Sequence, residues 1–299
     1  MPLLLVAACA IAACETNPVS LSGTLGGGGG GSTGVGPTVS QQKELMLAVE
    51  DEIEATVTAL TLSAPGVPPG FVAAGCPGAI SNPADNDHDG IPNNGSFSFT
   101  NPPCAGPFRG DSLTVTGSLG IVDASNADSV SYSLTYNNLA WAVTDTGGRS
   151  YTAIRTGTRQ RTAVRNSLKR DTTASLVNSS VTIIRVRPGM DTATVIAGES
   201  AVLTGGNVAS DTIGVKQNPP VGSLTFGGTL TWSRDTEAWS LQMATPSALH
   251  YNPVCVLTPQ RVDSGTVTLT GTVGGQAGVL TLKFTACARD PGYTWAKSP

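Results

Sequence analysis

Residues 130–136 read VSYSLTY, and the alternation in this stretch between large apolar and small polar side chains decides the fold class. Successive side chains of a β-strand point to opposite faces, so a period of two predicts a strand with one buried face. Similar alternation recurs along the chain at residues 113–121, 224–232, 239–243, 267–273 and 280–286. Glycine, asparagine and aspartate gather between these stretches, as is typical of turns.

The connections between these strands indicate an antiparallel sheet. After residue 62 no helical pattern is long enough to provide the crossovers that a parallel sheet needs. We therefore predict an all-β fold over residues 63–299, an antiparallel meander of about ten strands. It forms either a sandwich or a strongly curved, partly closed sheet.

The composition is typical of an exported β protein. Only 13% of the 299 residues are charged and 5% are aromatic, whereas the chain contains 36 glycines and 20 prolines. The formal net charge of −4 at pH 7 argues against a nucleic-acid binder, and we expect no nucleic-acid partner.

One amphipathic helix is expected before the sheet, over residues 38–62. Thr38 or Ser40 can serve as its N-cap, and apolar residues follow at spacings of three and four, namely Met46, Val49, Ile53, Val57 and Leu60. The acids Glu50, Asp51, Glu52 and Glu54 lie mostly off this apolar face. Such a helix packs on the sheet or plugs its open end; binding a partner is the alternative.

The first fourteen residues, MPLLLVAACAIAAC, predict a signal peptide over residues 1–13. The apolar run is too short to span a bilayer, which needs about 20 residues. Ile11-Ala12-Ala13-Cys14 resembles the bacterial lipobox, which implies cleavage before Cys14 and lipidation of its thiol. Cys9, after Val6-Ala7-Ala8, fits the same pattern but leaves a shorter apolar run before it. An ordinary signal peptide with an incidental cysteine is the other alternative.

The resemblance also implies an address in the bacterial cell envelope. In lipoproteins of this kind an aspartate after the lipidated cysteine favours the inner membrane, and Glu15 stands there instead. We therefore expect a protein anchored by lipid in the outer membrane, on its periplasmic or its surface face. Residues 14–37 are rich in glycine and form a flexible tether between the lipid and the folded part.

Four cysteines remain for the β domain once Cys9 and Cys14 are set aside. Proximity in the sequence favours bridges that each enclose one local unit, Cys76 with Cys104 and Cys255 with Cys287. Such bridges imply an oxidising compartment. A zinc ion held by all four cysteines is disfavoured because no pair has the close C-x-x-C spacing.

Residues 82–95 read NPADNDHDGIPNNG and predict a structural calcium loop. The carboxylates of Asp85, Asp87 and Asp89 stand at alternate positions before a glycine that permits a sharp turn. The run resembles thrombospondin type 3 repeats, which implies that these three carboxylates and the Ile91 carbonyl bind the ion, with Asn93 where another acid is common. Ser96 stands where an EF-hand has its bidentate glutamate, which predicts weak affinity. The alternative is an Asx-rich turn without an ion.

A basic segment in the middle of the chain predicts a face for anionic ligands. Most of its arginines have odd numbers and therefore share one face of extended chain. Bidentate arginine contacts suit phosphate, sulfate or carboxylate, as in an anionic lipid or glycan. The alternative is a solvated Thr/Arg face. The candidate residues are Arg155, Arg159, Arg161, Arg165, Arg185 and Arg187.

Catalytic motifs are absent from the sequence. The two histidines, His88 and His250, lie in the aspartate loop and near an expected strand end, and no G-x-S-x-G, H-E-x-x-H or P-loop motif occurs. Asp235 and Glu237 form the one acid pair considered for glycoside hydrolysis, although acids flanking a turn are ordinarily solvated. We expect no enzyme.

These observations lead to one principal hypothesis and two alternatives. The principal hypothesis is a non-catalytic envelope lipoprotein whose disulfide-stapled β domain, with a structural calcium loop, is an architectural or ligand-binding module. The first alternative is a periplasmic carrier that holds a lipid or another anionic ligand against its sheet. The second is an enzyme that acts on envelope glycans.

Overall fold

The computed structural model describes residues 36–298, apart from 62–77, 81–83, 87–90, 92, 109–110, 124–129, 145–149, 169, 187–192, 208, 215–218, 256–260 and 289–290. These residues belong to one compact unit, Gly34–Pro299. The predicted signal peptide and nearly all of the predicted tether, with Cys9 and Cys14, lie outside the described residues.

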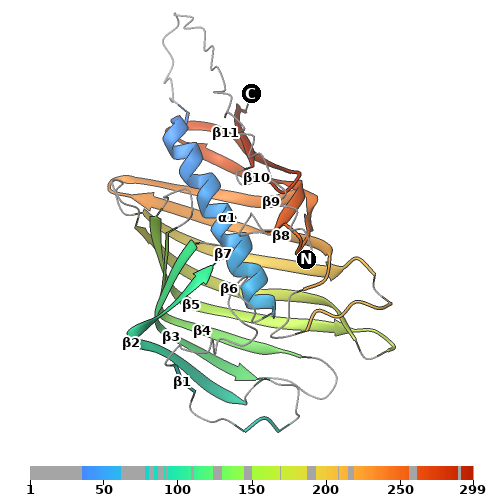
Figure 1. Cartoon of the computed structure of the whole chain (residues 1–299). Helices are drawn as coiled ribbons and strands as arrows, with labels where there is room; N and C mark the ends of the chain where they lie inside the picture. The colour runs from blue at the N-terminus through green and yellow to red at the C-terminus, as the bar shows by residue number, and fades with distance from the viewer. Residues whose placement is uncertain are drawn as a thin grey trace, which may run out of the picture. The chain divides into compact units, whose positions relative to one another are not determined.

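The fold is all-β, as predicted, and its strands form one sheet rather than the two sheets of a sandwich (Figure 1). Each strand pairs antiparallel with the next strand along the chain, so the sheet order is the sequence order. The strands are β1 (Gly78–Ile80), β2 (Asn94–Phe108), β3 (Asp111–Asp123), β4 (Tyr132–Thr144), β5 (Ser150–Arg165), β6 (Asp171–Val186), β7 (Ala193–Gly205), β8 (Gly222–Arg234), β9 (Glu237–Tyr251), β10 (Val262–Val273), β11 (Gln276–Thr285) and β12 (Gly292–Lys297).

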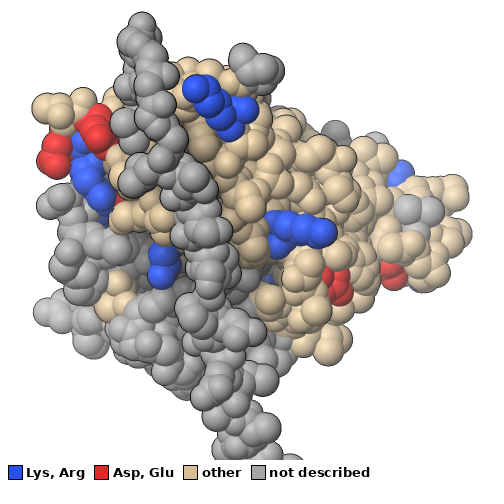
Figure 2. Space-filling model, turned by 90° about the horizontal axis from the view of Figure 1, so that it is seen from above, with Lys and Arg blue, Asp and Glu red and all other residues tan. Residues whose placement is uncertain are grey.

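The alternation in the sequence matches the two faces of this sheet. In the stretch quoted at the outset, Tyr132, Leu134 and Tyr136 are buried, whereas Ser133 and Thr135 between them are not. The period of two therefore separates an inner face from an outer face. Seen from above, the basic and acidic residues form only small separate patches (Figure 2).

Bulges bend the long strands. Several register shifts lie beside glycines in the left-handed region, including Gly117 (φ 95°) and Gly157 (φ 141°). A Cβ at Gly117 would lie 2.2 Å from the Asn138 carbonyl oxygen, and one at Gly157 would lie 2.1 Å from that of Ser180. Only glycine fits such a close approach of backbones, and bulges of this kind increase strand bending and twist.

Helix α1 (Val39–Thr61), the one helix among the described residues, begins with a reciprocal cap. The Gln41 amide donates to Thr38 Oγ1 at 3.2 Å, and the Thr38 amide donates to Gln41 Oε1 at 2.7 Å. This T-x-x-Q pattern is a capping box, which identifies Thr38 rather than Ser40 as the N-cap.

Helix α1 lies across the inner face of the sheet (Figure 1). Its first turns lie near the ends of β8 and β9, and its last turns reach β4 and β5. From Glu44 to Thr61 every residue except Glu54 is buried. The helix is therefore enclosed on all sides, and the acids Glu50, Asp51 and Glu52, expected off its apolar face, are buried as well.

The inner face has an apolar part and a charged part. Buried apolar side chains of β8 to β11 fill the first, including a stack of Trp232 on Trp239 with ring centroids 4.2 Å apart. The second lies on β5, β6 and β7, where arginines and one glutamate point inward. The acids of α1 meet this charged part.

Candidate functional site

Four of the six candidate arginines lie on the inner face, as their shared parity predicted, but they are enclosed. Arg155, Arg159 and Arg161 of β5 and Arg185 of β6 have exposed fractions of 3% or less. The alternative of a solvated Thr/Arg face is therefore wrong for these residues. Enclosed guanidinium groups need counter-charges or carbonyl acceptors, because an unpaired buried charge is very costly.

Arg159 lies between two carboxylates. Its Nη2 contacts Glu52 Oε1 of α1 and lies 3.2 Å from Glu199 Oε1 of β7. The Thr56 hydroxyl of α1 donates to the same Glu199 oxygen at 2.9 Å, and Arg159 Nε donates to Ser179 Oγ at 3.3 Å. Helix and sheet therefore share one hydrogen-bonded charge cluster.

Two further ion pairs join α1 to the sheet. Asp51 pairs with Arg185 of β6, and Glu44 pairs with Arg234 at the end of β8. The side chain of Arg185 is 1% exposed and that of Arg234 is 17% exposed, so the first pair is the better enclosed. Carboxylates spaced along one helix thus meet arginines of three different strands.

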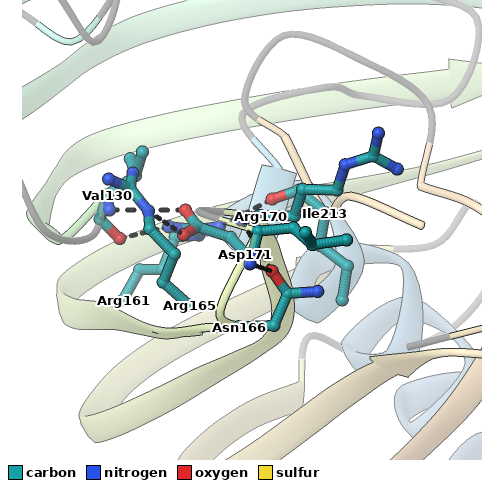
Figure 3. Close-up of polar contacts among 8 residues, drawn as sticks. Val130, Arg161, Arg165, Asn166, Arg170, Asp171 and Ile213 are labelled. Carbon is teal, nitrogen blue, oxygen red and sulfur yellow. Dashed lines mark hydrogen bonds and ion pairs between the residues drawn. The ribbon is translucent and has the colours of Figure 1, made fainter. Parts of the chain in front are cut away.

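Arg161 has carbonyl oxygens as its partners. Its Nε donates to Leu60 O at 2.6 Å and its Nη2 to Ile213 O at 2.9 Å, while Nη1 donates to Val130 O (Figure 3). One guanidinium therefore joins the end of α1, the approach to β4 and the segment after β7. Its carbon Cζ also lies 5.5 Å from the ring centroid of Tyr132.

Arg165 and Asp171 extend this network at the β5–β6 turn. Arg165 Nε donates to Asp171 Oδ1 at 3.0 Å, and the Val130 amide faces Asp171 Oδ2 at 3.4 Å (Figure 3). The Arg165 side chain is 25% exposed. Arg187 lies outside the described residues, so the six candidates are not gathered into one external face.

Burial sets the electrostatics of the Arg159 cluster. Burial raises the pKa of Glu199 above its ordinary value, against the attraction of Arg159 and the hydrogen bond from Thr56. Burial lowers the pKa of Arg159, with Glu199 opposing the shift. The Arg159 guanidinium stays charged because arginine has so high an ordinary pKa. The carboxyl group of Glu199, which shares this guanidinium with Glu52, is therefore the group whose ionisation burial disfavours. Burial also raises the pKa of Tyr136, whose ring centroid lies 5.8 Å from Arg159 Cζ.

The acids of this site are the residues that sequence reasoning missed. Glu44, Asp51, Glu52 and Glu199 were not among the candidates, although each now contacts an arginine. One signal was present: a helix rich in acids precedes a sheet rich in arginines. Opposite charges on two elements that must pack predict pairing between them.

The aspartate loop is described in part. Asn93 closes it, since its amide donates to Ala84 O at 2.9 Å and its Oδ1 accepts from the Asn86 amide at 3.1 Å. The Asp123 amide donates to Asn93 O at 3.2 Å, which ties the loop to β3. Ile91 is fully buried. Asp85 is half-buried, while Asp87 and Asp89 lie outside the described residues.

The predicted bridge between Cys255 and Cys287 is present, with Cα atoms 5.3 Å apart. The other predicted bridge falls on Cys76 and the side chain of Cys104, which lie outside what is described. Near the observed bridge, His250 Nδ1 lies 2.7 Å from Asp263 Oδ1. Burial acts to raise the pKa of Asp263, but hydrogen bonds from Asn252, His250 and Ser264 outweigh it, and the pKa lies below its ordinary value.

The acid pair considered for glycoside hydrolysis lies at the β8–β9 turn. Glu237 lines an open hollow of about 670 Å³ beside Ser240, Gln242 and Thr270, whereas Asp235 is not among the lining residues. Glu237 Oε2 also accepts from Gln41 Nε2 at 2.9 Å.

Fold and site together define a class: a twelve-stranded antiparallel meander with a helix held on its inner face by buried ion pairs. No protein-family model matches the chain, and no curated protein and no solved structure matches it either. Among the described residues, no helix is both long enough and apolar enough to cross a membrane.

Proposed function

We propose that the chain is a non-catalytic, lipid-anchored protein of the bacterial cell envelope whose β domain is an architectural module. One observation carries the proposal: α1 occupies the arginine-bearing inner face, and its own carboxylates take the place of an external anion. A carrier needs free space at this face for its ligand. A rigid module needs the face filled.

Mass spectrometry of the gently purified, full-length protein tests this choice. An architectural module is expected to carry no lipid other than its own anchor. A carrier is expected to retain a second lipid or another anion. A stoichiometric second ligand that survives purification would replace the architectural proposal with the carrier proposal.

The proposed address depends on the first fourteen residues. If Cys14 carries the lipid, then Cys14→Ser abolishes incorporation of labelled fatty acid and releases the protein from the membrane fraction. Cys9→Ser is the matched control, because it removes the other cysteine that fits the pattern. Loss of labelling in Cys9→Ser alone would move the anchor to Cys9, and a wild-type chain that incorporates no labelled fatty acid would remove the lipoprotein assignment.

A structural calcium ion in the aspartate loop is the second part of the proposal. The closed ends of the loop, joined through Asn93, support it, as does the half-buried Asp85 carboxylate. Asn93 Oδ1 accepts an amide hydrogen, so one lone pair at most remains for an ion. The expected site is therefore weak, with a dissociation constant of roughly 10⁻⁴ to 10⁻³ M.

Thermal unfolding in millimolar calcium and in excess chelator tests the loop. Because a ligand bound only by the native state stabilises it, calcium is expected to raise the Tm of the wild-type chain by several degrees. The variant Asp87→Ala/Asp89→Ala is expected to lose this shift. Magnesium in place of calcium is expected to raise the Tm of the wild-type chain by less than calcium does. Equal Tm values with calcium and chelator in the wild-type chain would leave an Asx-rich turn.

A further inference from the structure

A cluster of potential metal ligands surrounds the disulfide at the β9–β11 end of the sheet. Cys255 follows β9, Cys287 lies in the turn after β11, and Asp263 lies near the start of β10 between them. The two sulfur atoms and a carboxylate oxygen of Asp263 all lie within 4.8 Å of one another. Sequence spacing hides this cluster, because the three residues come from separate segments.

Asp263 is held in place by neighbours on both of its oxygens. Asn252 Nδ2 donates to Oδ2 at 2.8 Å, while His250 Nδ1 and Ser264 Oγ lie 2.7 and 3.1 Å from Oδ1. Carboxylates that bind a metal are commonly held by hydrogen bonds from outer partners in this way. The carboxylate is therefore oriented in advance beside the two sulfurs.

We propose that reduction of the Cys255–Cys287 bridge creates a site for a thiophilic divalent metal ion of the zinc class. The two thiolates and the Asp263 carboxylate are its protein ligands, and water completes a tetrahedron. Thiolates select zinc over calcium and magnesium, which prefer oxygen. His250 is a positioning residue that acts through Asp263.

The chemistry balances with a dithiol as reductant. The dithiol gives two electrons and two protons to the bridge, the S–S bond breaks to leave two thiols, and the reductant becomes a cyclic disulfide. Binding of the divalent ion then releases the two thiol protons. In the oxidised state the same cysteines are a covalent staple, so the site exists only in the reduced state.

The required movement is small. At zinc–sulfur distances of about 2.3 Å, two thiolates of a tetrahedral site lie about 3.8 Å apart. Cys287 lies in a turn rather than in a strand, so its side chain can move without breaking ladder hydrogen bonds. Cys255 is buried, which keeps one side of the site away from water.

Cobalt(II) titration of the full-length chain, reduced with a trialkylphosphine, tests the proposal. Tetrahedral cobalt thiolates have charge-transfer and visible bands that report ligand type. The reduced wild-type chain is expected to bind one more equivalent of cobalt than Cys255→Ser/Cys287→Ser, and the oxidised chain is expected not to bind this equivalent. Asp263→Asn keeps both thiols and is expected to bind at least tenfold more weakly, and His250→Ala about 10- to 100-fold more weakly.

Two results would overturn the proposal. One is an equal cobalt stoichiometry in the reduced wild-type chain and the double cysteine variant. The other is an equal cobalt affinity in the wild-type chain and Asp263→Asn, because thiols of a chain that unfolds on reduction bind metal without the help of this carboxylate. Asp263→Asn still forms the bridge before reduction, so it starts from the same fold.

Discussion

At the scale of single residues, Arg161 joins distant parts of the chain by hydrogen bonds. Its guanidinium donates to carbonyl oxygens of residues 60, 130 and 213, which belong to three separate segments. The odd numbering of the arginines predicted that Arg161 shares a face with Arg155 and Arg159. It did not predict enclosure, because the position of α1 against this face depends on how the whole sheet curves.

Replacing Arg161 tests its role as a tie between segments. Arg161→Met keeps an unbranched apolar stem but removes the guanidinium, which leaves three buried carbonyl oxygens without this donor, at about 1–3 kcal/mol for each unsatisfied group. We expect the free energy of unfolding, measured in urea, to fall by roughly 3 kcal/mol or more. Val164→Met on β5, which is 63% exposed, is the control and is expected to change stability little. If Arg161→Met lowered the free energy of unfolding as little as Val164→Met, Arg161 would not be a tie between these segments.

Glu199 makes stability depend on pH. Its folded-state pKa lies above the ordinary value of 4.5. The contribution of Glu199 to the free energy of unfolding is therefore fully present below pH 4.5 and declines as the pH rises toward the folded-state pKa. Glu199→Gln keeps the side chain's size and its acceptor for Thr56 and removes the ionisation. The stability of the variant relative to the wild-type chain is therefore expected to increase with pH above 4.5, as measured by urea unfolding at several pH values. A difference that stays flat or decreases with pH would contradict the assigned direction.

At the scale of elements, the helix and the sheet are complementary in charge. The spacing of apolar residues predicted the helix over residues 38–62, and it runs from Val39 to Thr61. The burial of its acids was not predicted, because hydrophobic periodicity assumes that one face of a helix is exposed. The acids of a helix enclosed on all sides need counter-charges, and these are arginines of β5, β6 and β8, up to 190 residues away in sequence.

Double-mutant cycles measure this complementarity. For Asp51 and Arg185, replaced by Asn and Met, we expect a coupling free energy of about 1–3 kcal/mol, because removing one partner leaves the other buried. For Glu44 and Arg234, replaced by Gln and Met, we expect a smaller coupling, because Arg234 is partly exposed and its charge is screened. The reverse order would contradict the argument from burial, and no coupling for either pair would show that neither pair contributes to holding α1 on the sheet.

The observed disulfide stabilises the last four strands. It closes a loop with a sequence separation of 32 residues, for which chain entropy predicts about 3–4 kcal/mol. Cys255→Ser/Cys287→Ser is therefore expected to lower the free energy of unfolding of the oxidised protein by about this amount. Proximity in sequence was enough to predict this pair, because one short unit of sheet brings its two ends together.

At the scale of the whole molecule, alternation predicted the class of fold but not its final form. Strands with a clear period of two, such as 130–136 and 267–273, were recognised, whereas β12 and the short β1 carry too little pattern. The strands form one sheet rather than two, and bulges such as those at Gly117 and Gly157 bend its strands in a way that period-two alternation does not predict. The charged inner face was missed for the same reason, since Glu52 and Glu199 meet only after the sheet curves.

The central claim is that α1 is a permanent part of the β domain and not a removable cover over an anion site. Native-state hydrogen exchange of the full-length protein tests it, because it separates local opening from global unfolding. The amides of Leu45–Leu60 are expected to exchange with the same free energy as those of β5 and β6, by global unfolding. If the α1 amides exchanged through a local opening of lower free energy, with β5 and β6 still protected, the claim would be contradicted. The arginine face would then again be a candidate ligand site.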